Sequence, residues 1–452
     1  MARNRVIYQS QALFIAPSAT GVQVSGTTGP NVGGAPTTNP NTTGELASGI
    51  SLLKKLDRIQ NCNFNFTINR QDINEFGKLA RIDSIVMEAP TVGLDFSYYV
   101  TDGYNERLLG FNITGFKSDG TTFIDTNVAN HAQAISGLLA DLQGNNYYIL
   151  TVDEGEDVVG GTLAPNSTIV GIGNGFISEY SFEASVGAIP TANITVEAFN
   201  IKSDANDSPI TISAATGPVG TEVGANIVTI TGGSPAIDLF AQPATKLTSV
   251  QKAYKLDYSR DFTGSIGSDA GVNFTGYTTG SSSVSALRPG DIVLSLGTSR
   301  GMTNLADAHI QSFSFTLPLS RTILQRLGNT FGFARVVDVP INMDVTISAI
   351  VSELQDKNLF DSLVSQKNDL SILLKDSNGI GKIRYEIKEA ILQSETYSEN
   401  LGDNQTVDLT YTVQIGGAND TTAGLFMSGS YASSLDSITS GFYKLGTSKL
   451  GW

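Results

Sequence analysis

The sequence Phe64-Asn65-Phe66-Thr67-Ile68 returns 249 residues later as Phe313-Ser314-Phe315-Thr316-Leu317. In both copies large apolar residues alternate with Asn, Ser or Thr, which is typical of a strand with one buried face. Three further matches follow in the same order, at offsets that drift from 250 to 215: residues 90–97 with 340–346, 136–139 with 361–364, and 186–191 with 401–406. This ordered series predicts that the chain contains one folding unit twice.

Hydrophobic periodicity around these matches gives each unit the order strand, strand, helix, strand, strand, strand. The expected helices cover residues 132–142 and 353–365. We therefore predict a mainly β fold of two tandem β-sandwich or barrel units, each with one flanking α-helix, plus a central insert. The expected domains are a first unit at 1–201 with a long loop at 17–48, an insert or linker with edge strands at 202–300, a second unit at 301–417 and a C-terminal arm at 418–452.

Composition excludes several classes of function. The formal net charge of the chain is −15, and its Lys and Arg residues are scattered, whereas binding to a nucleic-acid backbone needs clusters of basic residues. The one cysteine, Cys62, excludes an internal disulfide framework and favours folding in a reducing cytoplasm. No apolar run has the length of a membrane span or of a signal-peptide core, so no membrane partner is expected.

The sequence contains no pattern typical of a catalytic or metal site. The only histidines, His131 and His309, have no recognisable catalytic partner and are interpreted as surface or cap residues. Gly171–Gly175 is glycine-rich, but neither the Lys-Ser/Thr pair nor the helix of a phosphate loop follows it. Asp153–Asp157 lacks the alternating spacing of a calcium loop, so a solvated turn is favoured over an ion site. We expect no enzyme activity and no cofactor.

The polar side of the expected strands carries acids, amides and hydroxyls, and neither Lys nor Arg occurs on it. It includes residues such as Asn63, Thr195, Ser314 and Thr410. An ordinary solvated sheet face carries both signs of charge, and Lys is common there. Plain protein surface remains one interpretation of this pattern. The other is a face past which a polyanion slides without being held.

The sequence resembles the phage tail tube proteins, also called major tail proteins. The similarity is carried by residues 69–83, 88–92, 94–99, 181–192 and 415–417. The resemblance implies packed antiparallel sheets with a flanking helix, whose strands join those of neighbouring subunits into a barrel around a lumen. A subunit with two such units is expected to form trimeric, pseudo-hexameric rings. The rings are expected to stack through residues 17–48, 70–82 and 320–335.

The resemblance also implies partners and a place of action. The chain is expected to assemble with itself in the virion, after synthesis in the host cytoplasm, and to meet tape-measure, tail terminator or baseplate proteins. Double-stranded DNA is expected to pass through the lumen without specific binding. Strand parity makes five acidic residues the candidates for the lumen wall: Asp95, Glu183, Glu197, Asp344 and Asp408.

Three other classes of protein share part of this profile. A decoration or baseplate component of the virion has similar composition, but it does not need a face free of basic residues. A secreted surface-layer or adhesin protein also suits an acidic, Thr- and Asn-rich chain, although no export signal is visible. A β-sandwich hydrolase is the least favoured class, because no catalytic constellation is recognisable.

Overall fold

The structure is a computed structural model, and it is mainly β with large antiparallel sheets, as the sequence predicts. It describes residues 11–17, 53–86, 91–114, 133–139, 145–152, 168–198, 200–205, 256–257, 287–288, 290, 292–296, 309–324, 334–350, 367–398, 406–417 and 420–430. The loop expected at 17–48, the helix expected at 353–365, His131, Asp153–Asp157 and most of the insert expected at 202–300 lie outside these residues.

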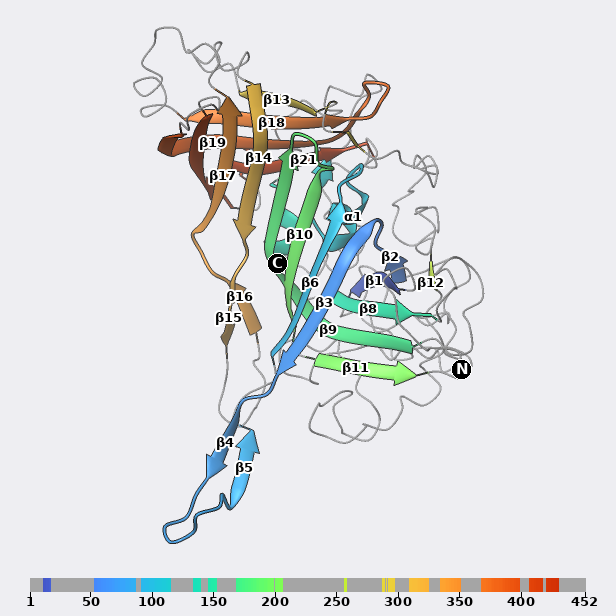
Figure 1. Cartoon of the computed structure of the whole chain (residues 1–452), viewed down its shortest axis with the longest axis vertical. Coiled ribbons are helices and arrows are strands. Elements are labelled where there is room, and N and C mark those ends of the chain that lie inside the picture. The colour runs from blue at the N-terminus through green and yellow to red at the C-terminus, as the bar shows by residue number, and fades with distance from the viewer. Residues whose placement is uncertain are drawn as a thin grey trace, which may run out of the picture.

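One antiparallel sheet, here called the long sheet, contains strands from both halves of the chain (Figure 1). Each strand pairs with the next in the order β3 (Ile59–Thr67), β6 (Thr91–Tyr99), β10 (Thr191–Ala198), β9 (Thr168–Ser185), β14 (His309–Pro318), β17 (Ile341–Ile350), β20 (Thr406–Ile415) and β19 (Gly381–Ser398). The pairing of β9 with β14 joins the two halves, and we call it the internal seam.

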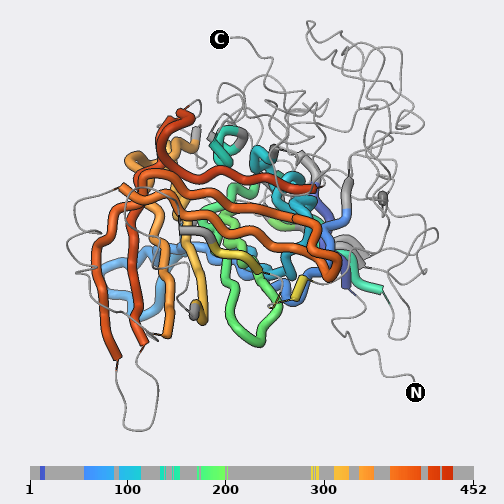
Figure 2. The backbone as a smooth tube through the Cα atoms, turned by 90° about the horizontal axis from the view of Figure 1, so that it is seen from above, coloured from blue at the N-terminus to red at the C-terminus, as the bar shows by residue number. Residues whose placement is uncertain are grey.

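Two short sheets continue from the long sheet, because β9 and β19 each run through two sheets. The first half of β9 lies between β8 (Asn145–Thr151) and β11 (Asn200–Ala205), and β1 (Gln11–Pro17), β2 (Leu53–Lys55) and β12 (Leu256–Asp257) extend this sheet. The first half of β19 lies between β18 (Asn368–Lys375) and β21 (Gly424–Gly429), followed by β13 (Ile292–Leu296) and β7 (Ile113–Thr114). Figure 2 shows β18, β19 and β21 running side by side.

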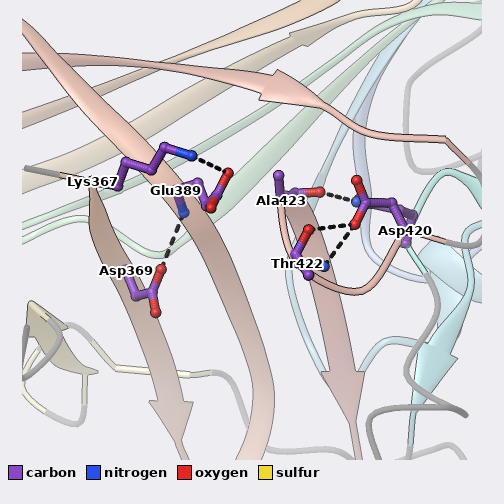
Figure 3. Close-up of polar contacts among 7 residues, drawn as sticks. Lys367, Asp369, Glu389, Asp420, Thr422 and Ala423 are labelled. Atoms are coloured by element: carbon purple, nitrogen blue, oxygen red, sulfur yellow. Dashed lines mark hydrogen bonds and ion pairs between the residues drawn. The ribbon is translucent and has the colours of Figure 1, made fainter.

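The transition of β19 between sheets occurs at Glu389, whose backbone adopts φ 62°. This left-handed conformation is uncommon for a residue with a side chain. Asp369 accepts a hydrogen bond from the Glu389 N–H at 3.1 Å, and Lys367 contacts the Glu389 carboxylate at 2.9 Å (Figure 3). Both contacts come from the start of β18, and they hold the bend of β19 in place. Nearby, the Asp420 carboxylate accepts hydrogen bonds from the N–H and the hydroxyl of Thr422, which shapes the turn before β21.

Two pairs of β-bulges occur at corresponding places in the two halves. The β3–β6 pairing skips Gln60, and the β14–β17 pairing skips Gln311. The β10–β9 pairing skips Ser178, and the β20–β19 pairing skips Gln393. A bulge shifts the pairing register of every residue beyond it, so these positions fix which residues lie opposite each other in the sheet.

Two β-hairpins extend from strand ends of the long sheet, the first beyond the ends of β3 and β6 and the second beyond the ends of β14 and β17 (Figure 1). The first contains β4 (Arg70–Ile73) and β5 (Asp83–Val86) and lies between β3 and β6 in the chain. The second contains β15 (Arg321–Leu324) and β16 (Ala334–Val337) and lies between β14 and β17. The two hairpins overlap residues 70–82 and 320–335, which the resemblance assigns to contacts between rings, although β5 and the end of β16 lie beyond these segments.

The described helices are short, and both belong to the first half of the chain. They are α1 (Tyr104–Leu109) and α2 (Ser136–Leu139), and α2 lies within the helix expected at 132–142. Glycines with positive φ, Gly103 and Gly110, flank α1 and let the chain turn sharply at both ends. The buried side chains of both halves form one continuous apolar cluster. The buried strand β21 lies within the segment expected to be the C-terminal arm.

Candidate functional site

The solvent face of the long sheet carries all five acidic residues that the sequence singles out. Asp95 lies opposite Thr195, Glu183 opposite Ser314, Asp344 opposite Thr316, and Asp408 opposite Ser348. Glu197 follows Thr195 by two residues on β10 and therefore faces the same way. Asp408 is half-buried, and the other four residues are exposed. The structure thus brings residues from β6, β9, β10, β17 and β20 onto one face.

Neither Lys nor Arg occurs in the long-sheet strands, taking β9 from Phe176 and β19 from Ile391. The face also carries Glu179, opposite Thr195. At one end of the face the Arg335 guanidinium donates a hydrogen bond to the carbonyl of Glu197 at 3.1 Å. Glu197 is therefore next to a cation, while Asp95 and Glu183 lie farther along the strands. The face is acidic and hydroxyl-rich over most of its length.

The two outer strands of the long sheet, β3 and β19, pair on one side only among the described strands. Phe64 and Phe66 of β3 lie opposite buried Leu94 and Val92 and so point to the apolar side of the sheet. They are nevertheless 44% and 56% exposed, whereas Phe313 and Phe315 of β14 are 2% and 1% exposed. The apolar side of β3 is therefore left uncovered.

The free edge of β19 shows the same feature. Tyr397 lies opposite buried Val407, yet it is 49% exposed, whereas Ile391 lies opposite Thr412 on the polar side and is 42% exposed. The Tyr397 hydroxyl donates a hydrogen bond to the Glu395 carboxylate at 2.5 Å, which raises the pKa of Tyr397 to about 12. An uncovered apolar side chain beside an unpaired backbone edge favours pairing with another strand.

The internal seam shows how such an edge is covered within the chain. Phe182 of β9 lies opposite Phe315 of β14, with their rings 5.5 Å apart, and both rings pack against Tyr385. Beside them, Arg321 and Arg335 of the second hairpin lie over the ring of Phe176, at 4.8 and 5.3 Å from its centroid. Paired backbones, packed aromatic rings and a hairpin together close this seam.

The tip of the first hairpin is apolar and exposed. Phe76 and Leu79 are fully exposed, and Ile73, Ile82 and Ile85 are also exposed. Exposed apolar side chains gathered on a protruding element mark a contact surface. The surface ion pairs Lys78–Glu75 and Arg81–Asp72 surround this tip.

A buried carboxyl lies where the two halves meet. Tyr98 donates a hydrogen bond to Glu106 Oε1 at 2.9 Å, Tyr180 donates to the same atom at 3.5 Å, and the Tyr180 and Tyr385 hydroxyls are 2.9 Å apart. Among the residues that the structure describes, Glu106 Oε2 has no hydrogen-bond partner. Burial raises the pKa of Glu106 to about 7, because the charged form loses its hydration. The hydrogen bond from Tyr98 lowers the pKa of Glu106 and so opposes this rise.

The described residues contain no group of three or more metal-ligating side chains, and no described helix is long and apolar enough to cross a membrane. Cys62 is half-buried on β3, and burial together with the nearby Asp95 charge raises its pKa to about 12, so it is a poor nucleophile. His309 begins β14, and the glycine-rich stretch Gly171–Gly175 lies within β9. Both His309 and Gly171–Gly175 are thus parts of β-strands.

The alternation of apolar and polar residues in the sequence predicted the polar face, but it did not predict which strands lie at the edges of the sheet. Phe64 and Phe66 alternate in sequence like Phe313 and Phe315, and nothing in their immediate neighbours indicates that only the second pair is covered. The order of strands in the sheet decides the difference. Buried Glu106 gives no signal in the sequence either. No family model and no curated protein matches this chain.

Proposed function

We propose that this chain is the subunit of a phage tail tube, built from two tandem tail-tube units. Two observations support the proposal beyond the resemblance of the sequence. The chain has uncovered apolar side chains at both outer strands of one long sheet, and the polar face of this sheet is free of basic residues. The uncovered edges carry the proposal, because they favour assembly through the sheet itself.

The matching bulges support the tandem arrangement. They relate β3, β6 and the first hairpin to β14, β17 and the second hairpin at an offset of 251 residues, and they relate β9 and β10 to β19 and β20 at an offset of 215. The short sheets correspond in the same way, with β8 matching β18 and β11 matching β21 in pairing order. Each unit thus contains four strands of the long sheet.

In the proposed assembly, β19 of one copy pairs with β3 of the next, as β9 pairs with β14 inside each chain. Repeating this head-to-tail contact closes a ring when the rotation between units allows it. Three chains give a pseudo-hexameric ring in which no strand edge is left unpaired. Rings stack through the hairpins into a tube of the virion tail, where tape-measure, terminator or baseplate proteins are the further partners.

The polar face lines the lumen in this proposal. Asp95, Glu183, Asp344 and Asp408 repel the phosphate backbone, and the hydroxyls between them give DNA no cation to bind. Salt screens this repulsion beyond roughly 10 Å, so the effect is confined to the wall. Double-stranded DNA then passes without specific binding.

Electron microscopy of the purified protein at high concentration, with averaging of end-on views, tests the proposal. Hollow tubes, or rings with threefold-modulated sixfold symmetry, are expected. Closed particles without a central channel would favour a decoration or baseplate protein and would overturn the tube. A protein that stays monomeric in the microscope even when tail-tip components are added would also contradict it.

A further inference from the structure

The internal seam contains a set of contacts that depends on one register. Phe182 lies opposite Phe315, Tyr180 lies opposite Leu317, and the Leu319 N–H donates a hydrogen bond to the Ser178 carbonyl at 2.7 Å. Ser178 is the bulged residue of β9, so the bulge itself presents this carbonyl to β14. The second hairpin then lies over Phe176.

Every member of this set has a counterpart at the free edges. The offset of 251 residues relates Phe315 to Phe64, Leu317 to Phe66 and Leu319 to Ile68. The offset of 215 residues relates Phe182 to Tyr397, Tyr180 to Glu395, Ser178 to Gln393 and Phe176 to Ile391. The internal partners are buried, whereas the apolar counterparts Phe64, Phe66, Ile391 and Tyr397 are all exposed.

We propose that a second copy of this chain covers these residues in the register of the internal seam, with Tyr397 opposite Phe64 and Ile391 beneath the base of the first hairpin. The inference deepens the proposed function and rests on it, since it names the residues that meet between copies. It also places the Ile68 N–H at the bulged Gln393 carbonyl. The internal seam between β9 and β14 and the contact between copies, β19 with β3, then have the same structure.

Matching of the two faces and of the bulge favours this register over its neighbours. A slip of one residue would place Phe64 opposite Thr396 or Ser398, which face the polar side, so the apolar sides of the two strands would no longer match. A slip of two residues would keep the faces but would place Tyr397 against Phe66, and the bulge at Gln393 would no longer meet Ile68. In the proposed register Tyr397 covers Phe64 as Phe182 covers Phe315, and cross-strand aromatic pairs of this kind stabilise a sheet.

The first hairpin completes the contact. Arg70 and Arg321 occupy the same place, because each begins its hairpin and lies opposite a valine, Val86 or Val337. Arg321 covers Phe176 within the chain. Arg70 is exposed, and in the proposed register Ile391 of the next copy lies beneath it, as Phe176 lies beneath Arg321. The aliphatic part of Arg70 then packs on Ile391 while its guanidinium remains in water.

Disulfide cross-linking of the assembled protein tests the register. In a Cys62→Ser background, the variant with Phe64→Cys and Tyr397→Cys is oxidised under assembly conditions and analysed on a non-reducing gel. Residues directly opposite on neighbouring strands have Cα separations that a disulfide spans, so covalent dimers and trimers are expected. Both replaced side chains are about half exposed, so the fold of the single chain does not depend on them.

Two matched variants complete the experiment. Phe182→Cys with Phe315→Cys uses the equivalent internal pair, and a cross-link within one chain with no dimer is expected. Phe66→Cys with Tyr397→Cys is two residues out of register, and a loss of at least tenfold in the yield of dimer is expected. Rings that form in the microscope but cross-link equally well out of register, or not at all, would overturn this inference and leave the tube standing. Absence of both rings and cross-links would overturn both.

Discussion

At the scale of single residues, Glu106 is the group whose protonation the fold controls most strongly. Its carboxyl is buried among Tyr98, Tyr180 and Tyr385, which come from three strands and from both halves of the chain. The charge of Asp102 adds to the effect of burial and raises the pKa of Glu106 further. Since Oε2 has no partner, the neutral carboxyl is the form that this site accommodates best.

This burial predicts that the chain becomes less stable between about pH 4.5 and about pH 7. The pKa of Glu106 rises from 4.5 to about 7 on folding, so in this interval the unfolded chain releases a proton that the folded chain keeps. Below the interval both states are protonated, and above it both are charged. Stability therefore falls with rising pH by up to about 3 kcal/mol and then levels off.

The Glu106→Gln variant checks this prediction by thermal or urea unfolding at pH 5 and pH 8. Glutamine has the same shape and keeps an oxygen for the Tyr98 hydroxyl, but it does not titrate. The difference in unfolding free energy between wild type and variant should shift in favour of the variant at pH 8. A difference that is the same at both pH values would show that Glu106 does not carry the effect.

The same scale shows what the sequence repeat determines and what it does not. The matches around Phe64 and Asp95 give an offset of 249 residues, whereas the bulges at Gln60 and Gln311 place corresponding residues 251 apart. An error of two residues leaves every side chain on the same face, because the strand repeats every two residues. The alternation within each strand therefore places all five acidic candidates on one face, whichever of the two offsets is used.

At the scale of elements, the first hairpin predicts a separation between ring formation and ring stacking. Phe76 and Leu79 are fully exposed at its tip. Burying a large apolar side chain contributes roughly 1.5–3 kcal/mol, so the variant with Phe76→Ser and Leu79→Ser should need at least tenfold more protein to form tubes. Its rings should form normally, and light scattering with electron microscopy would measure both.

The matched control for this experiment is Lys78→Ser at the same tip. Lys78 forms an exposed ion pair with Glu75, and such pairs contribute little. Thermal unfolding of all three proteins should be alike, because none of the replaced side chains packs on the body of the fold. Tubes that form equally well from the Phe76 and Leu79 variant would exclude the hairpin tip as a stacking contact.

Elements with strong alternation were predictable from the sequence, and those defined by distant contacts were not. The expected strands around residues 64–68, 92–99, 180–186, 194–198 and 370–374 all occur. The buried strand β21 was hidden in a Gly- and Ser-rich segment, because all six of its residues are buried and no alternation marks it. The sequence also did not predict that β9 and β19 each belong to two sheets, because this depends on a bend and on pairing with strands far along the chain.

At the scale of the whole molecule, the polar face predicts how the assembled protein responds to a change of charge. The double variant with Asp95→Lys and Glu183→Lys places cations where two exposed acids now lie. Assembled rings of this variant should hold a short DNA duplex, and the affinity should fall steeply with salt, because counterions compete for the phosphates. Fluorescence anisotropy of a labelled duplex measures the binding.

The control is the neutral double variant with Asp95→Asn and Glu183→Gln. It removes the same charges but adds no cation, so little DNA should be held at moderate salt. Wild-type rings should hold none. Equal binding by the lysine variant as monomer and as ring would mean that ring closure does not bring the face around the duplex.

The internal seam has a further consequence for the kinetics of assembly. Because β9 and β14 belong to one polypeptide, their contact forms during folding at a rate that does not depend on protein concentration. In the proposed ring of three chains, half of the contacts between units are then already made, and only the β3–β19 contacts require encounters between molecules. Fewer bimolecular steps reduce the translational entropy lost on closure and leave fewer incomplete rings at low abundance. In the proposed assembly, the chain would therefore complete rings at a low concentration of subunits.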